Sequence, residues 1–451
     1  MGNFSSQKGS ASITRDENEP VILHDFHILR SVGRGAFGKV CIIQKKDTKQ
    51  LYGLKYMAKR AIIERAASRN VLKELEILKL LHHSFLVNLC FSFQDEDDMY
   101  IVLDLMLGGD IRFHLNQGHL FSEEEIVLYI FEIGLALGYL RKKRIIHRDI
   151  KPDNLLLDSK GHIHLTDFNI ATWLPEGKIA VSISGTRPYM APEVFATGAG
   201  KSVGYSFEVD WWSWGVTLCE MMKGRRPFTI HHDMTSEHIL KTLSENTVLN
   251  LPPPVTSSMS KFMKDLLQPN VKKRVCSVAS FKNYAALRSV DISKVEKKLI
   301  PSKFKPSNDR LNCDPTHELE EMMIESNPLH KKKRRKRPKT TSSANKIKDP
   351  IQQSLENLTN KFTSFRRGSN VDEASLVMSN ETIEILSGRK SQQPSPRTIG
   401  DSPPSQPPTP RVKTSDIPSV HLNDEPLTPS TNTHTSSSSL NGKITNENRN
   451  P

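Results

Sequence analysis

The sequence predicts an α+β fold in which a β-rich segment precedes a larger helical one, with a polar tail after both. Three strand-like segments lie near the N-terminus, at residues 26–32, 39–43 and 51–57, and turn residues separate them. Apolar residues then recur at helical spacing over 68–82 and 122–141. A chain of 451 residues can hold two lobes of this kind plus a sizeable further segment.

Composition divides the chain into four parts. Residues 1–25 form a polar leader, 26–281 hold the strand and helix patterns, and 282–330 are mixed with some apolar residues. Residues 331–451 are basic at first and then rich in Ser, Thr, Pro and Asn. Such a segment buries too little apolar surface to offset the entropy lost on ordering, so we expect 331–451 to be mostly disordered.

Cysteine usage and hydropathy exclude several classes of protein. The five cysteines are scattered without paired spacing, which argues against a disulfide framework or a zinc site and fits a reducing compartment. No stretch approaches the roughly 18 apolar residues of a membrane-spanning helix. The net charge of +13 comes largely from one run at 330–339, so it describes a local patch. We expect a monomeric cytoplasmic protein.

A glycine-rich motif joins the first two predicted strands. It reads Gly33-Arg34-Gly35-Ala36-Phe37-Gly38-Lys39-Val40. Glycines let a backbone approach phosphate groups closely and offer N–H donors without side-chain obstruction. Because the motif joins two strands instead of opening a helix, it disfavours dinucleotide binding and favours a lid over a nucleotide. Taken alone, it is equally well explained by an ordinary hairpin turn.

A lysine and a glutamate extend the case for a nucleotide site. Lys55 lies on the third predicted strand, and Glu74 lies on the helix predicted over 68–82. Each residue alone is typical of an exposed surface position. As a pair they favour an ion pair that orders the lysine against the α- and β-phosphates.

The segment His147-Arg148-Asp149-Ile150-Lys151-Pro152-Asp153-Asn154 carries the strongest chemical signal. Pro152 breaks any helix, so the segment is a loop. A short hairpin follows it, in which 155–157 pair with 163–165. Asn154 directly precedes the first strand and Asp167 comes just after the second, so antiparallel pairing brings the two side chains together. Amide and carboxylate oxygens are hard ligands that suit Mg²⁺, with Mn²⁺ as an alternative.

Two further residues of this loop suit phosphoryl transfer. Asp149 is placed to accept the proton of a hydroxyl group, and Lys151 is placed to neutralise a transferring phosphoryl group. Any one of these charges alone is typical of a solvated surface. Their joint spacing favours the functional interpretation.

Together these motifs resemble the eukaryotic protein kinase family over roughly residues 26–281. The matching pieces follow the family's order and spacing, and they include Asp167-Phe168-Asn169 and Ala191-Pro192-Glu193. The resemblance implies a bilobal protein kinase fold, with ATP as co-substrate and proteins as acceptors. Lysine at position 151 is typical of the serine/threonine branch, so the expected reaction transfers the γ-phosphoryl group of ATP to serine or threonine.

The resemblance also implies roles for single residues. Asp149 is the expected catalytic base, Lys151 the phosphate contact, and Asn154 and Asp167 the metal ligands. Ser182 matches the activation-loop phosphorylation site by position. The expected ATP-binding residues are Val32, Gly33, Arg34, Gly35, Ala36, Phe37, Gly38, Lys39, Val40, Lys55, Glu74, the gatekeeper Leu103, and Asp104 and Met106 of the hinge.

Further segments narrow the resemblance to the AGC group of kinases. Phe85-Leu86-Val87, Asp210-Trp211-Trp212-Ser213 and the stretch over 300–316 are similar to that group. Asp167-Phe168-Asn169 and residues 308–321 resemble its YANK subgroup, the serine/threonine-protein kinase 32 family. The resemblance implies that Asp210 is buried and braces the catalytic loop. It also implies a structural ion pair between Glu193 and Arg274.

Some positions depart from the family pattern. Asn169 stands where most kinases have glycine, and we expect asparagine to tolerate the unusual backbone angles there. Cys313 stands where many AGC tails have phenylalanine, and we find no clear Phe-x-x-Phe motif after it. These departures motivate an alternative, a nucleotide-binding scaffold without catalysis. The presence of Lys55, Asp149 and both expected metal ligands argues against it.

Charged residues near the expected peptide groove leave the substrate preference open. Asp110, Asp153 and Glu220 match acidic positions that read basic residues in AGC relatives. Arg187 replaces a proline in the substrate-binding segment and favours an acidic or phosphorylated residue instead. Both alternatives remain.

The two ends of the chain bear on where the protein acts. The first six residues fit the N-myristoylation pattern with Gly2 as acceptor. One acyl chain gives only marginal membrane binding, with a constant on the order of 10⁴ M⁻¹. In one interpretation, the run Lys331–Arg337 binds electrostatically to the anionic inner leaflet of the plasma membrane. It is equally typical of a nuclear-import signal or of a solvated charge run. It has no interleaved aromatic residues, so we expect no specific nucleic-acid partner.

Overall fold

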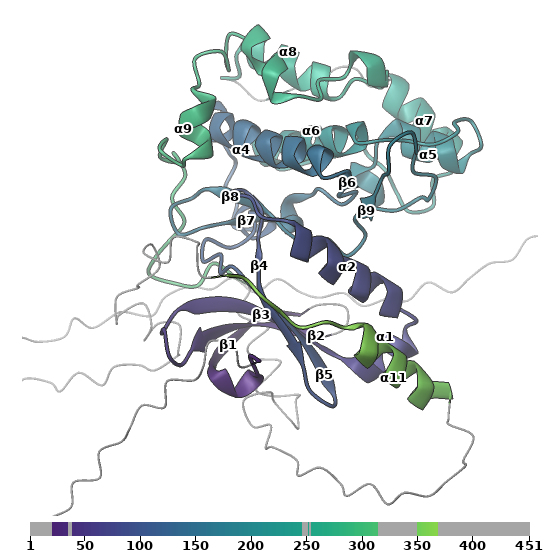
Figure 1. The fold of residues 1–451 in the computed structure, drawn as a ribbon. Helices are drawn as coiled ribbons and strands as arrows, with labels where there is room; N and C mark the ends of the chain where they lie inside the picture. The colour runs from purple at the N-terminus through teal and green to yellow at the C-terminus, as the bar shows by residue number, and fades with distance from the viewer. Residues whose placement is uncertain (1–19, 35–37, 246–250, 252–253, 314–349, 369–451) are drawn as a thin grey trace, which may run out of the picture. The chain divides into compact units, whose positions relative to one another are not determined.

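The computed structural model describes residues 20–34, 38–245, 251, 254–313 and 350–368 of the chain. All of these residues belong to one compact unit, which comprises residues 1–392. They form a β-rich first lobe and a larger helical second lobe, as the sequence predicts (Figure 1). The predictions for Gly2, for Gly35-Ala36-Phe37 and for Lys331–Arg337 lie outside the described residues.

The first lobe is built on a six-stranded antiparallel sheet. Its strand order is β1-β2-β3-β5-β4-β10. The strands are β1 (Phe26–Arg34), β2 (Gly38–Lys45), β3 (Leu51–Ala58), β4 (Leu89–Gln94), β5 (Asp98–Leu103) and β10 (Phe365–Arg366). The three strands predicted near the N-terminus are confirmed, each with slightly longer bounds.

Two helices follow β3 and connect it to β4. They are α1 (Lys59–Glu64) and α2 (Ser68–Leu80). The apolar stripe that predicts the second of these helices, Val71, Leu75 and Leu78, is buried. Packing of this stripe sets the position of α2, and with it the position of Glu74 on the same buried face.

Gly38, at the start of β2, lies too close to the neighbouring strand for any residue other than glycine. A Cβ atom at Gly38 would lie 1.7 Å from the backbone carbonyl oxygen of Tyr56 on β3. No side chain fits at that distance, because the obstructing atom belongs to the backbone of a paired strand. Strand pairing therefore requires the last glycine of the motif, independently of any ligand.

The second lobe is organised around two buried helices. Its helices are α3 (Ile111–Asn116), α4 (Glu123–Lys142), α5 (Pro192–Gly198), α6 (Glu208–Lys223), α7 (Ser236–Glu245), α8 (Ser257–Leu266) and α9 (Ile292–Glu296). Ser122 and Glu125 form the predicted capping box at the start of α4. Nearly every residue of α6 is buried, including three tryptophans, so this helix serves as the centre of the core. No helix among the described residues is long and apolar enough to cross a membrane.

Two short ribbons flank the loop 147–154 in the second lobe. One pairs β6 (Ile145–Ile146) with β9 (Thr172–Trp173), and the other pairs β7 (Leu155–Leu157) with β8 (Ile163–Leu165). The second ribbon has the predicted bounds on both strands. The loop that precedes this hairpin therefore ends where the loop that follows it begins, at one end of the hairpin.

Residues 300–313 run along the second lobe and reach the segment that links the two lobes. Phe304 packs against the rings of His114, His119 and Phe121. The side-chain amide of Asn312 donates a hydrogen bond of 3.0 Å to the carbonyl oxygen of Leu107. The extension is thereby fastened beside the hinge.

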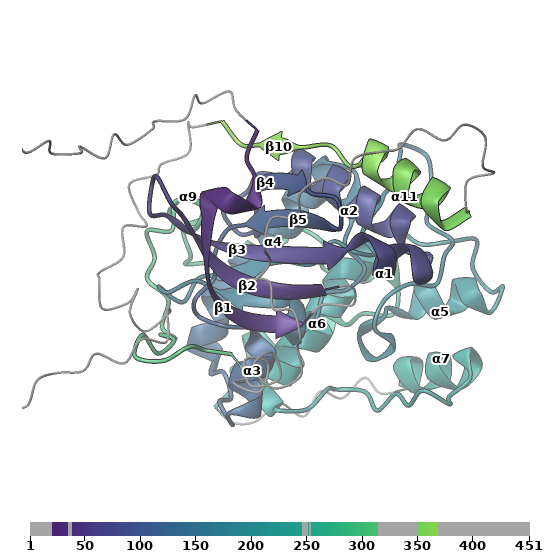
Figure 2. The same ribbon diagram turned by 90° about the horizontal axis from the view of Figure 1, so that it is seen from below.

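Part of the C-terminal tail is folded, within the span 331–451 that the sequence predicts to be mostly disordered. Residues 350–368 form α11 (Pro350–Lys361) and β10, which lie beside α1 and at the edge of the sheet next to β4 (Figure 2). Leu358 and Phe362 are buried, at 2% and 3% exposure. Phe362 and Phe365 also have the Phe-x-x-Phe spacing that the sequence analysis did not find. Burial of these apolar side chains offsets the cost of ordering the segment.

Candidate active site

The loop 147–154 is held by a buried aspartate in the first turn of α6. The backbone N–H groups of His147 and Arg148 each donate a hydrogen bond of 2.8 Å to the Asp210 carboxylate, one to each oxygen. Asp210 is 3% exposed, and burial raises the pKa of this carboxyl group. The predicted brace is confirmed. It joins the loop rigidly to the central helix of the lobe.

Asp149 receives hydrogen bonds on both of its carboxylate oxygens. Thr186 donates to Oδ1 from its hydroxyl group at 2.6 Å and from its backbone N–H at 3.1 Å. Lys151 Nζ and Asn154 Nδ2 donate to Oδ2 at 2.8 Å and 3.0 Å. Burial opposes the charge of Asp149, but the donors Lys151 and Thr186 outweigh it and lower the pKa of this carboxyl group. Asp149 is therefore ionised and able to accept a proton at neutral pH.

The hairpin brings Asn154 and Asp167 to the same place, as predicted. Leu155 pairs with Leu165, and the backbone N–H of Thr166 donates to the carbonyl oxygen of Asn154 at 3.0 Å. Asp167 is the next residue, and its φ of 67° turns the chain sharply there. Its Oδ1 atom is buried without a hydrogen-bond donor. A buried carboxylate oxygen without a donor, next to an amide, fits a hard divalent cation such as Mg²⁺.

Lys55 lies at the centre of a small buried network. Its Nζ atom is 2.7 Å from Glu74 Oε1, 3.4 Å from Asn169 Oδ1 and 3.8 Å from Asp167 Oδ1. Burial opposes its charge, but Glu74 and Asp167 outweigh this and raise the pKa of Lys55. The predicted pairing of Lys55 with Glu74 is present, so an ion pair links α2 to β3.

Asn169 differs from its expected role. Its φ is not positive, and the unusual backbone angle lies two residues earlier, at Asp167. Asn169 instead contributes its side-chain oxygen to Lys55. Phe168, between them, is buried and lies edge-on to the His147 ring with centroids 4.9 Å apart. The asparagine thus supplies a polar contact that a glycine there would lack.

The glycine-rich strands and the hinge enclose the space beside Lys55. Val40 on β2 is paired with Lys55, and Gly33 on β1 is paired with Val40. Val32 and the hinge residues Leu105 and Leu107 pack against the same small cluster of Ile42 and Leu51. Of the predicted ATP-binding residues, Gly33, Val40 and Lys55 therefore lie side by side across three strands, on the face where a nucleotide would be covered by the glycine-rich turn.

The structure adds detail to two predicted residues of the hinge region, Leu103 and Asp104. Gly53 on β3 is paired with Leu103, the expected gatekeeper at the end of β5. The Asp104 carboxylate accepts hydrogen bonds from Asn88, at 3.0 Å from its backbone and 2.8 Å from its side chain. The other carboxylate oxygen accepts the Cys90 thiol at 3.3 Å, and the backbone N–H of Asp104 donates to the Asn88 carbonyl oxygen at 3.0 Å, so of the polar groups of Asp104 its carbonyl oxygen is the one left for a ligand. Met106 is half-buried on the same segment.

Comparison with known proteins identifies this constellation. The model of the family "Protein kinase domain" matches residues 26–284, more than half of the chain. The chain belongs to the protein kinase family. Serine/threonine-protein kinase 32C of Homo sapiens is 46% identical over 81% of this chain and 76% of its own length. Serine/threonine-protein kinase 32B of Homo sapiens is 47% identical over 78% and 86%. The RAC family serine/threonine-protein kinase homolog of Dictyostelium discoideum is 37% identical, over 64% of each chain.

These relatives confirm the recognition made from the motifs. The chain is a serine/threonine kinase that transfers the γ-phosphoryl group of ATP to proteins, and it is 46–50% identical to serine/threonine-protein kinases 32C and 32B. The matched residues end close to the predicted boundary at 281. The alternative of a scaffold without catalysis finds no support in the geometry around Asp149.

Ser182 of the kinase lies within reach of the catalytic loop. Arg148 NH1 donates a hydrogen bond of 2.7 Å to Ser182 Oγ, and the hydroxyl group of Tyr205 donates to the Ser182 carbonyl oxygen at 2.5 Å. The side chain of Ser182 is otherwise exposed. An arginine beside an exposed hydroxyl group is the arrangement that binds a phosphate after modification.

The structural ion pair of the second lobe is also in place. Arg274 donates two hydrogen bonds to the Glu193 carboxylate, at 2.6 Å and 2.9 Å. The Arg274 side chain is fully buried, and its guanidinium lies 5.1 Å from the Trp212 ring centroid. This bidentate pair confirms the prediction and ties α5 to the end of the lobe.

Sequence reasoning missed three contributors to the site. Thr186 was given no role, although it contacts both Asp149 and Lys151. Arg112 was not considered, because an arginine on a short helix carries no local signal. Asn169 was expected to act through its backbone. The spacing of Phe362 and Phe365 was the one available signal for the folded tail segment.

Proposed function

We propose that Asp149 is the catalytic base of this kinase and that Asn154 and Asp167 hold its Mg²⁺. Bound Mg²⁺ would neutralise charge on the phosphate oxygens. The support is the geometry of Asp149. Its carboxylate is ionised, donors bind both of its oxygens, and one of these donors is the expected metal ligand Asn154. A substrate hydroxyl group that reaches Oδ2 or Oδ1 finds a base that is already charged and fixed in place.

Each residue of the constellation has one part in the transfer. The substrate serine or threonine oxygen forms a bond to the γ-phosphorus, and the bond from that phosphorus to the ADP oxygen breaks. The hydroxyl proton passes to the Asp149 carboxylate. Lys151, at 2.8 Å from Asp149, places its positive charge beside the transferring group. Lys55, held by Glu74, orients the α- and β-phosphates.

A peptide-library assay with labelled ATP tests this proposal. The wild-type kinase should label serine and threonine peptides when Mg²⁺ is supplied, and Asp149→Asn should lower kcat by at least about 100-fold. Titration with Mn²⁺, followed by its electron paramagnetic resonance signal in the presence of ATP, reports metal binding without turnover. Asn154→Ala and Asp167→Ala should weaken that binding, whereas Asp149→Asn should retain most of it. Equal metal binding by all variants would contradict the assignment of ligands.

We further propose that the kinase acts at the inner face of the plasma membrane, through a myristoyl group on Gly2 and the basic run Lys331–Arg337. The support is the sequence pattern at Gly2 and the seven consecutive basic residues of the run. One acyl chain is a marginal anchor, and roughly 1 kcal/mol of attraction per basic residue near an anionic surface makes the pair of signals sufficient. A pool in the nucleus is the alternative that the same basic run allows.

Binding to vesicles separates these alternatives. Full-length myristoylated kinase should sediment with vesicles that contain phosphatidylserine, and Gly2→Ala should abolish this. Replacing the run Lys331–Arg337 with glutamines should weaken binding and remove its dependence on salt. Nuclear accumulation of the Gly2→Ala protein in cells, lost when the run is replaced, would favour the nuclear-import interpretation. Analytical ultracentrifugation of the same samples tests the proposed monomeric state.

A further inference from the structure

The surface beside Asp149 is organised by one arginine, Arg112 of α3. Its guanidinium donates to Glu220 Oε1 at 3.0 Å from NH1 and to Asp153 Oδ2 at 3.4 Å from Nε. NH2 donates to the hydroxyl oxygen of Tyr189 at 2.8 Å. Tyr189 in turn donates to the second oxygen of Glu220 at 2.5 Å. One arginine therefore binds two carboxylates and a tyrosine at the same time.

This network lies next to the position of the acceptor hydroxyl group. Asp153 belongs to the 3₁₀ turn Pro152–Asn154, whose last residue donates to Asp149. Tyr189 ends the 3₁₀ turn Arg187–Tyr189, which directly follows Thr186, another donor to Asp149. A peptide that delivers a hydroxyl group to Asp149 must pass over these two turns.

The network removes the acidic side chains from the reach of a substrate cation. Glu220 is 7% exposed and both of its oxygens are engaged, one by Arg112 and one by Tyr189. Asp153 remains 48% exposed, but its carboxylate faces the positive charge of Arg112. A substrate arginine would have to displace Arg112 to reach either group. Displacing Arg112 would leave its own charge without carboxylate partners, so binding a substrate arginine at this place has a high free-energy cost.

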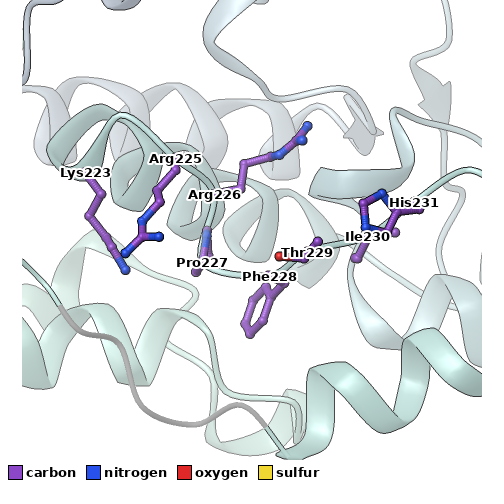
Figure 3. A pocket seen from close by; sticks show the side chains of 8 residues that line it. All are labelled: Lys223, Arg225, Arg226, Pro227, Phe228, Thr229, Ile230 and His231. Carbon is purple, nitrogen blue, oxygen red and sulfur yellow. The ribbon is translucent and has the colours of Figure 1, made fainter. Parts of the chain in front are cut away.

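The residues that follow Glu220 add unpaired positive charge to the same region. The loop after α6 forms a pocket of about 360 Å³ lined by Lys223, Arg225 and Arg226 together with residues 227–231. Figure 3 shows Lys223 and Arg225 extending to the same side of this loop. Neither side chain forms an ion pair within the described part of the chain. Arg226 extends to the other side of the loop in Figure 3 and lies 5.9 Å from the ring centroid of Tyr189, so it is through Arg226 that the basic loop adjoins the Arg112 network.

Arg187 is a second cation with spare binding capacity near Thr186. Its NH2 group donates to the carbonyl oxygen of Met234 at 2.6 Å, while its Nε atom is buried without a hydrogen-bond partner. No carboxylate pairs with Arg187 among the residues that the structure describes. A partly buried guanidinium without a counter-ion favours an anionic partner from outside the chain.

We propose that this kinase selects serine or threonine residues flanked by anionic side chains, because Arg112 occupies Glu220 and Asp153, two of the three acidic residues that would otherwise bind a substrate arginine. The third, Asp110, accepts the backbone N–H of Phe113 at the start of α3. This inference rests on the phosphotransfer function proposed above and names its substrate class. Recognition comes from the unpaired cations Arg187, Arg225 and Lys223. A carboxylate or a phosphate group supplies the required charge. Of the two alternatives that the sequence leaves open, this proposal favours acidic substrates.

Three sets of peptides test the proposal with the full-length wild-type kinase. The peptides share one acceptor serine and differ only in flanking residues, which are arginine, alanine or aspartate, with a phosphoserine set as a fourth arm. We expect kcat/KM for the aspartate set to exceed that for the arginine set by about 10-fold, the effect of one favourable charge contact. The phosphoserine arm shows whether a phosphate group is preferred to a carboxylate. Equal or higher kcat/KM for the arginine set would overturn the proposal.

Variants of Arg112 and Arg225 test whether these residues cause the substrate preference. Arg112→Ala frees Glu220 and Asp153, so the ratio of arginine to aspartate peptides should rise about 10-fold, with the substrate arginine taking the vacated place. Arg225→Glu, on an exposed loop, should lower the preference for aspartate. Arg60→Ala removes an arginine from an exposed ion pair with Glu64 on α1 and serves as the matched control. An unchanged ratio in both Arg112→Ala and Arg225→Glu would overturn the assignment.

These outcomes remain distinct from a failure of the proposed function. Transfer to no peptide, with wild type equal to Asp149→Asn, would overturn the phosphotransfer proposal and this inference with it. Transfer with the wrong preference would overturn only this inference. The wild-type comparison decides the preference even if Arg112→Ala does not fold.

Discussion

Lys59 and Thr359 are 300 residues apart in the chain, and the ammonium group of Lys59 donates a hydrogen bond of 3.0 Å to the Thr359 hydroxyl oxygen. Lys59 is 2% exposed and also donates to the carbonyl oxygen of Asp95 at 2.7 Å. A buried lysine needs polar partners because its charge is costly to remove from water. One of these partners comes from α11, so the first lobe of the kinase is completed by its own C-terminal tail.

The tail segment 350–368 should support both the stability of the first lobe and the position of α2. Lys79 on α2 donates to the carbonyl oxygen of Thr363, and Arg367 donates to the carbonyl oxygen of Leu81 just beyond the helix. We expect Phe362→Ala to lower the free energy of unfolding by about 3 kcal/mol. Amide exchange along β4 should accelerate, and KM for ATP should rise as α2 loosens.

Ile351→Ala is the control for this prediction, since Ile351 lies on the same helix but is 44% exposed. Hydrogen exchange followed by mass spectrometry measures the β4 edge, and thermal unfolding measures stability. Unchanged protection of β4 in Phe362→Ala would show that the segment does not depend on this side chain.

The hydroxyl group of Thr186 should set the acidic limb of the pH–rate profile. It donates to Asp149 at 2.6 Å and helps to keep the pKa of that carboxyl group below its ordinary value. In Thr186→Val the burial of Asp149 remains and one donor is lost, so the pKa rises and more of the base is protonated at a given pH. We expect the acidic limb of kcat/KM to move to higher pH and kcat to fall by roughly 10–100-fold, the effect of one hydrogen bond to a charged group.

Thr186→Ser retains the hydroxyl group and should keep the wild-type limb. A profile of kcat/KM against pH for the three proteins checks this. An acidic limb that stays in place in Thr186→Val would assign the titration to another group.

His83 should make the kinase less stable as the pH falls below neutrality. Burial lowers the pKa of His83 to about 4, and its Nδ1 atom accepts a hydrogen bond of 3.2 Å from the backbone N–H of Phe85. The unfolded chain binds a proton at His83 below about pH 6.5, while the folded chain does so only below about pH 4. The contribution of His83 is therefore complete above pH 6.5 and is lost between these two values, by up to about 3 kcal/mol.

Urea unfolding at a series of pH values measures this slope. His83→Asn keeps a hydrogen-bond acceptor but does not titrate, so its stability should change less between neutral and mildly acidic pH. The exposed His231 supplies the control variant His231→Asn, which should keep the wild-type slope. Identical slopes for wild type and His83→Asn would count against the prediction.

Two ion pairs of equal length should differ greatly in their contribution to stability. Arg274 with Glu193 and Lys261 with Asp265 both have an N–O distance of 2.6 Å. The Arg274 side chain is fully buried, whereas the Lys261 side chain is 68% exposed. Arg274→Met leaves the Glu193 carboxylate without its partner and should lower the free energy of unfolding by about 3–5 kcal/mol.

Lys261→Met should lower the free energy of unfolding by less than about 1 kcal/mol, because water screens the exposed pair. Chemical denaturation of both variants gives the comparison directly. Similar losses for the two would mean that burial does not govern the strength of these pairs.

The parts of the site that could be predicted depend on local geometry. The hairpin β7–β8 follows from short apolar runs around a turn, and its pairing alone brings Asn154 next to Asp167. Glu74 was predicted only as a partner of Lys55, and it lies on the buried face of α2 with Val71 and Leu78. In contrast, Thr186 comes within 2.6 Å of Asp149 from 37 residues away, and no local pattern encodes that distance.

The sequence by itself determined the family, the residue types of the catalytic loop and the order of the elements. These follow from hydrogen bonding and apolar periodicity over short stretches of chain. Only the tertiary structure decided that Arg112 neutralises Glu220, 108 residues away, and that β10 closes the edge of the sheet beside β4. Such contacts depend on how buried surfaces of distant segments pack, and a charge or a short apolar pair in the sequence does not specify its partner. The negative charge of Glu220, one of the residues that left a basic substrate open in the sequence, is satisfied inside the protein by Arg112 and Tyr189.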